Sequence, residues 1–110
     1  MPTYTPVRQG QAQAGIAFSN LYVVGAGKTA IVKTLSVCNV TAGSVALDVS
    51  LVNQGGTASD ANAVVRNHTI PPYATVMYTF DQVLAAQGFV AVKASVAAAL
   101  TLTLSGVEYA

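Results

Sequence analysis

The sequence predicts an all-β domain, an antiparallel β-sandwich or jelly-roll-like barrel of about eight short strands. From residue 16 onward, short apolar runs alternate with turns rich in Gly, Pro, Asn and Ser, and helical periodicity is nearly absent. The chain has 110 residues, enough for one compact core and too few for two. We therefore expect an extended N-terminal arm over residues 1–15 and a single β-sandwich domain over residues 16–110.

The predicted arm has a composition that cannot bury enough apolar area to fold alone. It contains Pro2 and Pro6, and residues 8–15 read RQGQAQAG. We expect this segment to extend from the domain and to lie along a neighbouring molecule.

The first half of the domain contains three strand patterns. Residues 16–24 hold one or two strands, and Gly25-Ala26-Gly27 then supplies a tight turn. Residues 30–40 are rich in Ile, Val, Thr and Leu on both faces, which predicts a central strand. The clearest half-buried strand follows at residues 45–51. Val45, Leu47, Val49 and Leu51 occupy every second position, and Ala46, Asp48 and Ser50 lie between them.

The second half begins with a long polar loop at residues 53–62 and a strand at 63–70 that ends before Pro71-Pro72. Val76, Tyr78 and Phe80 share one face of the next strand, so we expect Tyr78 in the core. Residues 81–88 are predicted to form a single helical turn or a compact loop. Strands at 89–95 and 100–107 complete the predicted sheets.

The composition indicates either a neutral but wettable surface of Ala, Thr, Ser, Asn and Gln or a surface partly covered by a partner, and we favour the partner. The chain is 53% hydrophobic and only 8% charged, against roughly a quarter charged in ordinary soluble domains. Its net charge is +1 and its five cations are scattered, so we expect neither nucleic acid nor a membrane surface as a partner. The N-terminus lacks the apolar stretch of a signal peptide, which predicts synthesis in a cytoplasm.

The inventory of reactive residues predicts no enzyme, no cofactor and no metal site. His68 is the single histidine, and the four acids are spread over the chain at Asp48, Asp60, Asp81 and Glu108. Cys38 is the only cysteine, so it cannot form a disulfide within the chain, and its apolar neighbours favour a small buried hydrophobe.

One segment has a superficial likeness to a phosphate-binding loop. Gly27-Lys28-Thr29 matches the end of that motif, but Tyr22 stands where the motif needs glycine. We interpret the segment as a hairpin turn with an exposed lysine.

Two stretches carry a resemblance to a known class of proteins. Residues 25–39 read GAGKTAIVKTLSVCN, and they are followed later by Val83-Leu84, Gly88 and the ending LSGVE at residues 104–108. Over residues 21–108 the chain resembles small β-sandwich virion proteins of tailed bacteriophages, most closely head decoration or cement proteins.

That resemblance implies a subunit on the capsid surface of a virion that clamps major capsid protein and neighbouring copies of itself, without catalytic residues. The arm and the tyrosines are the candidate interface, because tyrosine is enriched in protein interfaces. We expect interface positions at Pro2, Tyr4, Pro6, Arg8, Tyr22, Tyr73 and Tyr109. The alternatives are a tail, neck or fibre-associated virion protein, and a glycan- or receptor-binding β-sandwich.

Overall fold

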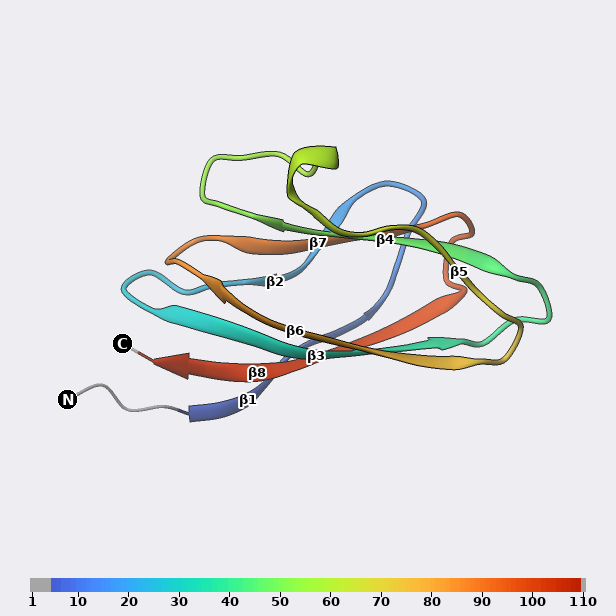
Figure 1. Ribbon diagram of the computed structural model, residues 1–110, viewed down its shortest axis with the longest axis horizontal. Helices are drawn as coiled ribbons and strands as arrows, with labels where there is room; N and C mark the ends of the chain where they lie inside the picture. Colours follow the sequence, from blue (N-terminus) through green and yellow to red (C-terminus); the bar gives the residue numbers. More distant parts are fainter. Residues whose placement is uncertain (1–4, 110) are drawn as a thin grey trace.

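Eight antiparallel strands form two stacked four-stranded sheets in the computed structural model, which describes residues 5–109 (Figure 1). The lower sheet of Figure 1 has the order β1-β8-β3-β6, with bounds Thr5–Gln13, Leu100–Tyr109, Thr29–Asn39 and Thr75–Leu84. The upper sheet has the order β2-β7-β4-β5, with bounds Ser19–Val23, Phe89–Ala94, Val45–Val52 and Ala63–Ile70. A 3₁₀ turn, η1 (Asp60–Asn62), lies in the loop above the upper sheet.

The strand order is that of a jelly roll. β4 pairs with β5, β3 with β6, β2 with β7 and β1 with β8, so the chain is one long hairpin whose tip lies between β4 and β5. The hairpin is wound so that every consecutive pair of strands except β4 and β5 lies in different sheets. An eight-stranded double sheet of this kind is the jelly-roll architecture. The predicted fold class is confirmed.

The core lies between the two sheets and is built by period-two alternation. In the lower sheet, Leu35 and Val37 of β3 are fully buried beside the alternate leucines of β8, which are Leu100, Leu102 and Leu104. They pack against the inward residues of the upper sheet, which include Val45, Leu47, Val49, Val90 and Val92. Each such side chain contributes roughly 1.5–3 kcal/mol on leaving water.

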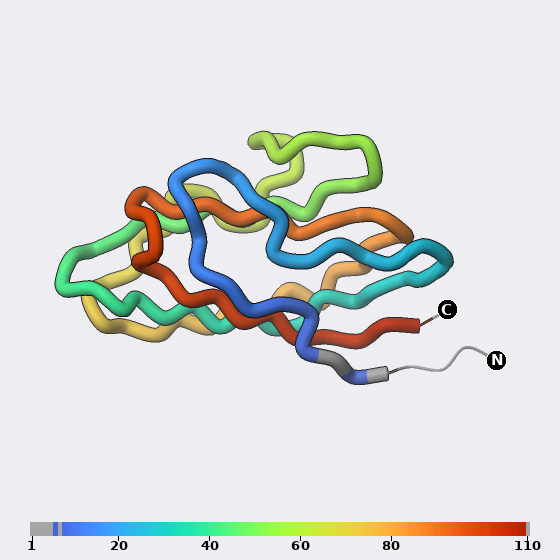
Figure 2. The backbone as a smooth tube through the Cα atoms, turned by 180° about the vertical axis from the view of Figure 1, so that it is seen from behind, coloured from blue at the N-terminus to red at the C-terminus, as the bar shows by residue number. Residues whose placement is uncertain are grey.

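The predicted arm is corrected in part, because Thr5–Gln13 form strand β1 at the edge of the lower sheet. β1 pairs with β8 from Thr5 opposite Glu108 to Gln13 opposite Thr101. An edge strand is held by backbone hydrogen bonds as well as by side chains, so its polar composition does not prevent pairing. Figure 2 shows the chain leaving β1 and crossing to β2 in the other sheet on the back of the molecule.

Two local expectations also change. The sequence predicts a single helical turn or a compact loop over residues 81–88. β6 instead continues to Leu84, so the helical turn is wrong, and the loop is confined to a short turn before β7. A register shift between Val32 and Thr34 places Val32 in the core and Ile31 on the outer face. Cys38 lies half-buried on that same outer face rather than in the core.

Candidate interaction surface

The outer face of the lower sheet carries an apolar row across all four strands. Pro6 of β1 lies opposite Val107 of β8, Val107 lies opposite Ile31 of β3, and Ile31 lies opposite Val83 of β6. Val83 is 63% exposed, Pro6 is exposed, and Ile31 and Val107 are half-buried. No element of the described chain covers this row, so the apolar surface stays open to a partner.

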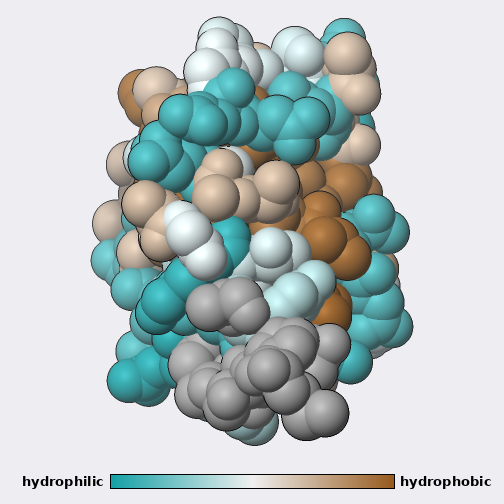
Figure 3. All heavy atoms as spheres, turned by 90° about the vertical axis from the view of Figure 1, so that its left-hand side faces the viewer, coloured by the Kyte–Doolittle hydropathy of each residue, from teal (hydrophilic) through white to brown (hydrophobic). Residues whose placement is uncertain are grey.

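The row lies at the end of the sandwich where β1 begins and β8 ends. Figure 3 looks at this end and shows apolar surface open between polar segments. Val23 of β2 is 50% exposed, and its strand also ends at this side of the molecule (Figure 1).

The remainder of this face is almost uncharged. Uncharged side chains lie opposite one another in two further rows, which are Gln11, Thr103, Ser36 and Met77, and Gln13, Thr101, Cys38 and Thr75. Lys33 and Asp81 form an ion pair of 3.7 Å where the register shifts, and Arg8 lies on the edge strand. We call this whole outer surface of β1, β8, β3 and β6 the neutral face.

The structure places the predicted interface residues at three different locations. Pro6, Arg8 and Tyr109 lie on strands of the neutral face, and Tyr109 pairs with Thr29 beside the apolar row. Tyr73 is 70% exposed in the turn between β5 and β6. Tyr22 packs against the core between the sheets. Pro2 and Tyr4 lie outside the described residues.

Sequence reasoning missed most of the apolar row, because only Pro6 was among the expected interface residues. Ile31, Val83 and Val107 belong to strands far apart in the sequence. From the local sequence alone, each has the apolar character of a core residue. The register of the sheet brings them together, and no short sequence pattern reports that register.

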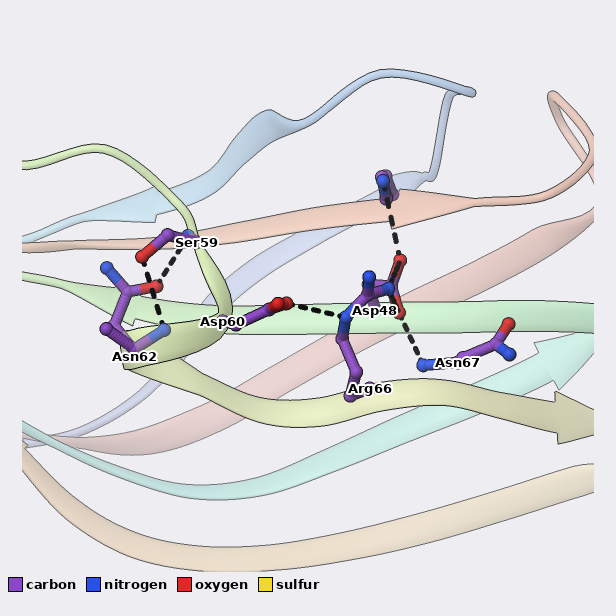
Figure 4. A network of polar contacts seen from close by, with 8 residues as sticks. Asp48, Ser59, Asp60, Asn62, Arg66 and Asn67 are labelled. Atoms are coloured by element: carbon purple, nitrogen blue, oxygen red, sulfur yellow. Dashed lines mark hydrogen bonds and ion pairs between the residues drawn. The ribbon is translucent and has the colours of Figure 1, made fainter.

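The outer face of the upper sheet is charged and organised around Asp48 of β4. The Asp48 carboxylate accepts hydrogen bonds from Arg66 Nη1 at 3.2 and 3.3 Å and from the backbone N–H of Asn67 (Figure 4). Lys93 Nζ lies 3.6 Å from the same carboxylate, and Arg66 Nε donates to Asp60 at 2.8 Å. Hydrogen bonds to both carboxylates raise the pKa of the Arg66 guanidinium above its already high value.

The same cluster fixes the polar loop of residues 53–62 over the sheet. Ser59 and Asn62 form a capping box around η1, in which the Asn62 side chain accepts from the Ser59 N–H at 2.9 Å. Asp60, in the same turn, reaches Arg66 of β5 (Figure 4). Asp48 is only 8% exposed under this arrangement.

No three His, Cys, Asp or Glu side chains within residues 5–109 lie together as metal ligands. His68 is exposed on β5 and hydrogen bonds through Nδ1 with the Tyr78 hydroxyl of β6. The 3₁₀ turn is the one helical element described, and no helix there has the length and apolarity to span a membrane.

Comparison with known proteins shows the fold and not a family. No family model matches the sequence, and no curated protein matches it. The structure is similar to VP2 in a subviral particle of infectious bursal disease virus, with a TM-score of 0.63 and 12% identity over 98% of this chain and 32% of that chain. A chain of the T13 particle of the same virus gives a TM-score of 0.57 at 12% identity, covering 98% of this chain and 35% of the other. The protein thus spans about a third of the length of these chains.

Proposed function

We propose that this protein is a structural protein of a virus particle, and that it binds the major capsid protein as a decoration or cement subunit. The observation that carries the proposal is the jelly-roll strand order, which aligns over 98% of the chain with a protein that forms a viral particle. The resemblance of residues 21–108 to phage decoration proteins points in the same direction. The proposed role is non-catalytic.

The neutral face supplies the docking surface in this proposal. A face that is four strands wide, nearly uncharged and apolar at one end loses little on desolvation, because few ionic groups must leave water. Its partner would present a similarly uncharged surface on the shell. Many copies bound side by side would add weak contacts between copies to modest individual affinities.

The proposal is tested by purifying the particles made in infected host cells and counting copies of this protein by quantitative mass spectrometry. A decoration subunit is expected in hundreds of copies on the outside of the shell, and a cryo-EM map should show the lower sheet facing the capsid. A few copies at a vertex, neck or tail would overturn the decoration role and favour the tail, neck or fibre alternative. Absence from purified particles would overturn the virion role itself.

Single substitutions then test which face docks. Val83→Lys and Thr79→Lys place a charge at exposed positions of the neutral face. Thr69→Lys is the matched control, because Thr69 is exposed and pairs with Ala46, an outward position of the opposite sheet. We expect the first two variants to lose particle binding while the third retains it. Equal binding by all three would contradict docking through the neutral face.

A further inference from the structure

The charged outer face of the upper sheet contains a hollow of about 270 Å³. Asp48, Arg66, Asn67, Lys93 and Ser95 line its polar side. A smaller hollow of about 50 Å³ adjoins it and shares Asp48, Arg66 and Lys93. Both lie on the opposite side of the sandwich from the neutral face, so a ligand here would remain accessible on a docked subunit.

The acid of the large hollow is already neutralised by its neighbours. Asp48 receives two contacts from Arg66, one hydrogen bond from the Asn67 backbone and one ion pair from Lys93. These contacts engage both oxygens of the Asp48 carboxylate. Asp48 therefore positions the two cations and is already engaged by them.

Several donors around the hollow remain available. Arg66 uses Nε and Nη1 for Asp60 and Asp48, and its Nη2 makes no hydrogen bond with the described residues. Lys93 is held above the Phe18 ring at 4.9 Å, with one contact to Asp48 and further N–H groups free to donate. The Ser95 hydroxyl accepts from the Ala46 N–H at 3.0 Å, which leaves its own proton for a ligand.

The remaining wall is apolar. Ile16 is 69% exposed at the rim, and Ala46 and Ala94 complete this side of the hollow. The volume lies just below the usual range of small-molecule sites, roughly 300–1,000 Å³, and suits a ligand of one ring. Asp48 and Asp60 balance the charges of Arg66 and Lys93, so the free N–H groups of these cations and the Ser95 hydroxyl call for acceptor oxygens, and the apolar wall calls for C–H groups on the same ligand.

We propose that this hollow binds an acidic sugar, with the sugar carboxylate on the free donors of Lys93 and Arg66 Nη2, beside the occupied Asp48 carboxylate, and a C–H face of the ring against Ile16. The inference is independent of the proposed docking role, because it concerns the opposite face and is tested on the isolated protein.

The test is a titration of the full-length protein followed by two-dimensional NMR, with glucuronate and N-acetylneuraminate as probes and glucose and acetate as comparators. We expect shifts confined to residues around the hollow with either acidic sugar at millimolar concentration, and much weaker effects with glucose or acetate. Lys93→Met should weaken binding about tenfold or more, since a charge-assisted hydrogen bond is lost while the side-chain stem is kept. Ser95→Ala should weaken it severalfold.

Lys28→Met is the matched control, because Lys28 is an exposed, ion-paired lysine at the end of the sandwich beside Glu108. It should bind as the wild type does. Saturation by acetate at the same concentration would show a general anion site and overturn the sugar assignment. The sugar assignment would also be overturned if glucose bound as tightly as the acidic sugars, or if Lys28→Met lost as much affinity as Lys93→Met. The absence of NMR shifts with every probe would overturn it too.

Discussion

The hydroxyl of Tyr22, on β2 of the upper sheet, donates a 2.6 Å hydrogen bond to the carboxylate of Glu108, on β8 of the lower sheet. Lys28 Nζ lies 3.7 Å from the same carboxylate. Burial raises the pKa of the Tyr22 hydroxyl above its ordinary value, and the hydrogen bond and the charge of Glu108 raise it further. The contact joins the two sheets, as the His68–Tyr78 contact does between β5 and β6.

Tyr22→Phe should lower the free energy of unfolding by about 1–3 kcal/mol at neutral pH, because a hydrogen bond to a charged acceptor is lost. A pKa that is raised in the folded state gives stability that is complete below the ordinary tyrosine pKa of about 10 and disappears as pH rises above it. The difference between wild type and Tyr22→Phe should therefore be constant up to about pH 9 and then shrink. Urea denaturation from pH 7 to 11 measures it.

Tyr73→Phe is the control for this series, because Tyr73 is 70% exposed. We expect a change within about 0.5 kcal/mol. If the difference in free energy of unfolding between wild type and Tyr22→Phe stayed unchanged at pH 11, the hydrogen bond donated by the Tyr22 hydroxyl would not be its source.

Asn39 is fully buried at the other end of the sandwich and connects two turns. Its amide nitrogen lies 2.8 Å from the carbonyl of Gly43 and 3.1 Å from those of Ile70 and Pro71. Its Oδ1 accepts from the Thr41 N–H at 2.9 Å. The β3–β4 turn and the β5–β6 turn are thereby fixed to each other.

Asn39→Ala should lower the free energy of unfolding by about 2 kcal/mol, because the buried Ile70 carbonyl and three part-buried backbone groups lose their partner together. Asn53→Ala, at an exposed loop position, should change it by no more than about 0.5 kcal/mol. Chemical denaturation of both variants gives the comparison. Equal stability of the two would mean that water replaces the Asn39 amide.

The strands of the core could be predicted because inward and outward residues alternate within each strand. Leu100, Leu102 and Leu104 show this pattern without any knowledge of their partners, and all three are buried. The alternation does not show which side chains point inward where strand pairing shifts the register. The register shift beside Lys33 depends on how β3 meets β6 and β8, so the local sequence does not locate it.

The charged cluster around Asp48 also could not be predicted from local sequence patterns. Asp48 alternates with apolar residues, a pattern typical of a solvated strand face, and the sequence predicts four scattered acids. The fold brings Asp60 and Arg66 over it through a loop and a neighbouring strand. Burial of Asp48 is a consequence of these long-range partners and not of its immediate neighbours in the sequence.

Gly106 of β8 can carry no side chain without displacing the central strands. A Cβ built there would lie 2.1 Å from the Ile31 carbonyl oxygen and 2.8 Å from Gln9 Oε1. Gly106→Ala should therefore lower the free energy of unfolding by about 3 kcal/mol or lower the yield of folded protein. Gly43→Ala, whose Cβ would meet no atom within 4 Å, should leave stability unchanged or raise it by up to about 1 kcal/mol. Thermal unfolding of the pair measures the contrast, and similar melting temperatures would contradict it.

β1 should be necessary for the stability of the sandwich and not only for contacts with other subunits. Removal of residues 1–13 would leave the hydrogen-bonding edge of β8 without a partner. Gly10→Ala tests the same packing by one methyl group, because its Cβ would lie 2.4 Å from the Leu21 carbonyl oxygen. We expect both variants to melt at a lower temperature than the wild type in calorimetry. An unchanged melting temperature after truncation would restore the interpretation of this segment as a free arm.

Docking through the neutral face should depend little on ionic strength. Its charges are Arg8 and the Lys33–Asp81 pair, so few ionic contacts to the shell can form, and screening by salt acts on charges alone. We expect the Kd for empty shells to change less than about threefold between 0.1 and 0.5 M NaCl, and to decrease in sulfate, which favours apolar burial. Val83→Ala should raise the Kd by about fivefold through lost apolar contact. A Kd that rises more than about tenfold with NaCl would instead indicate docking through the charged cluster around Asp48.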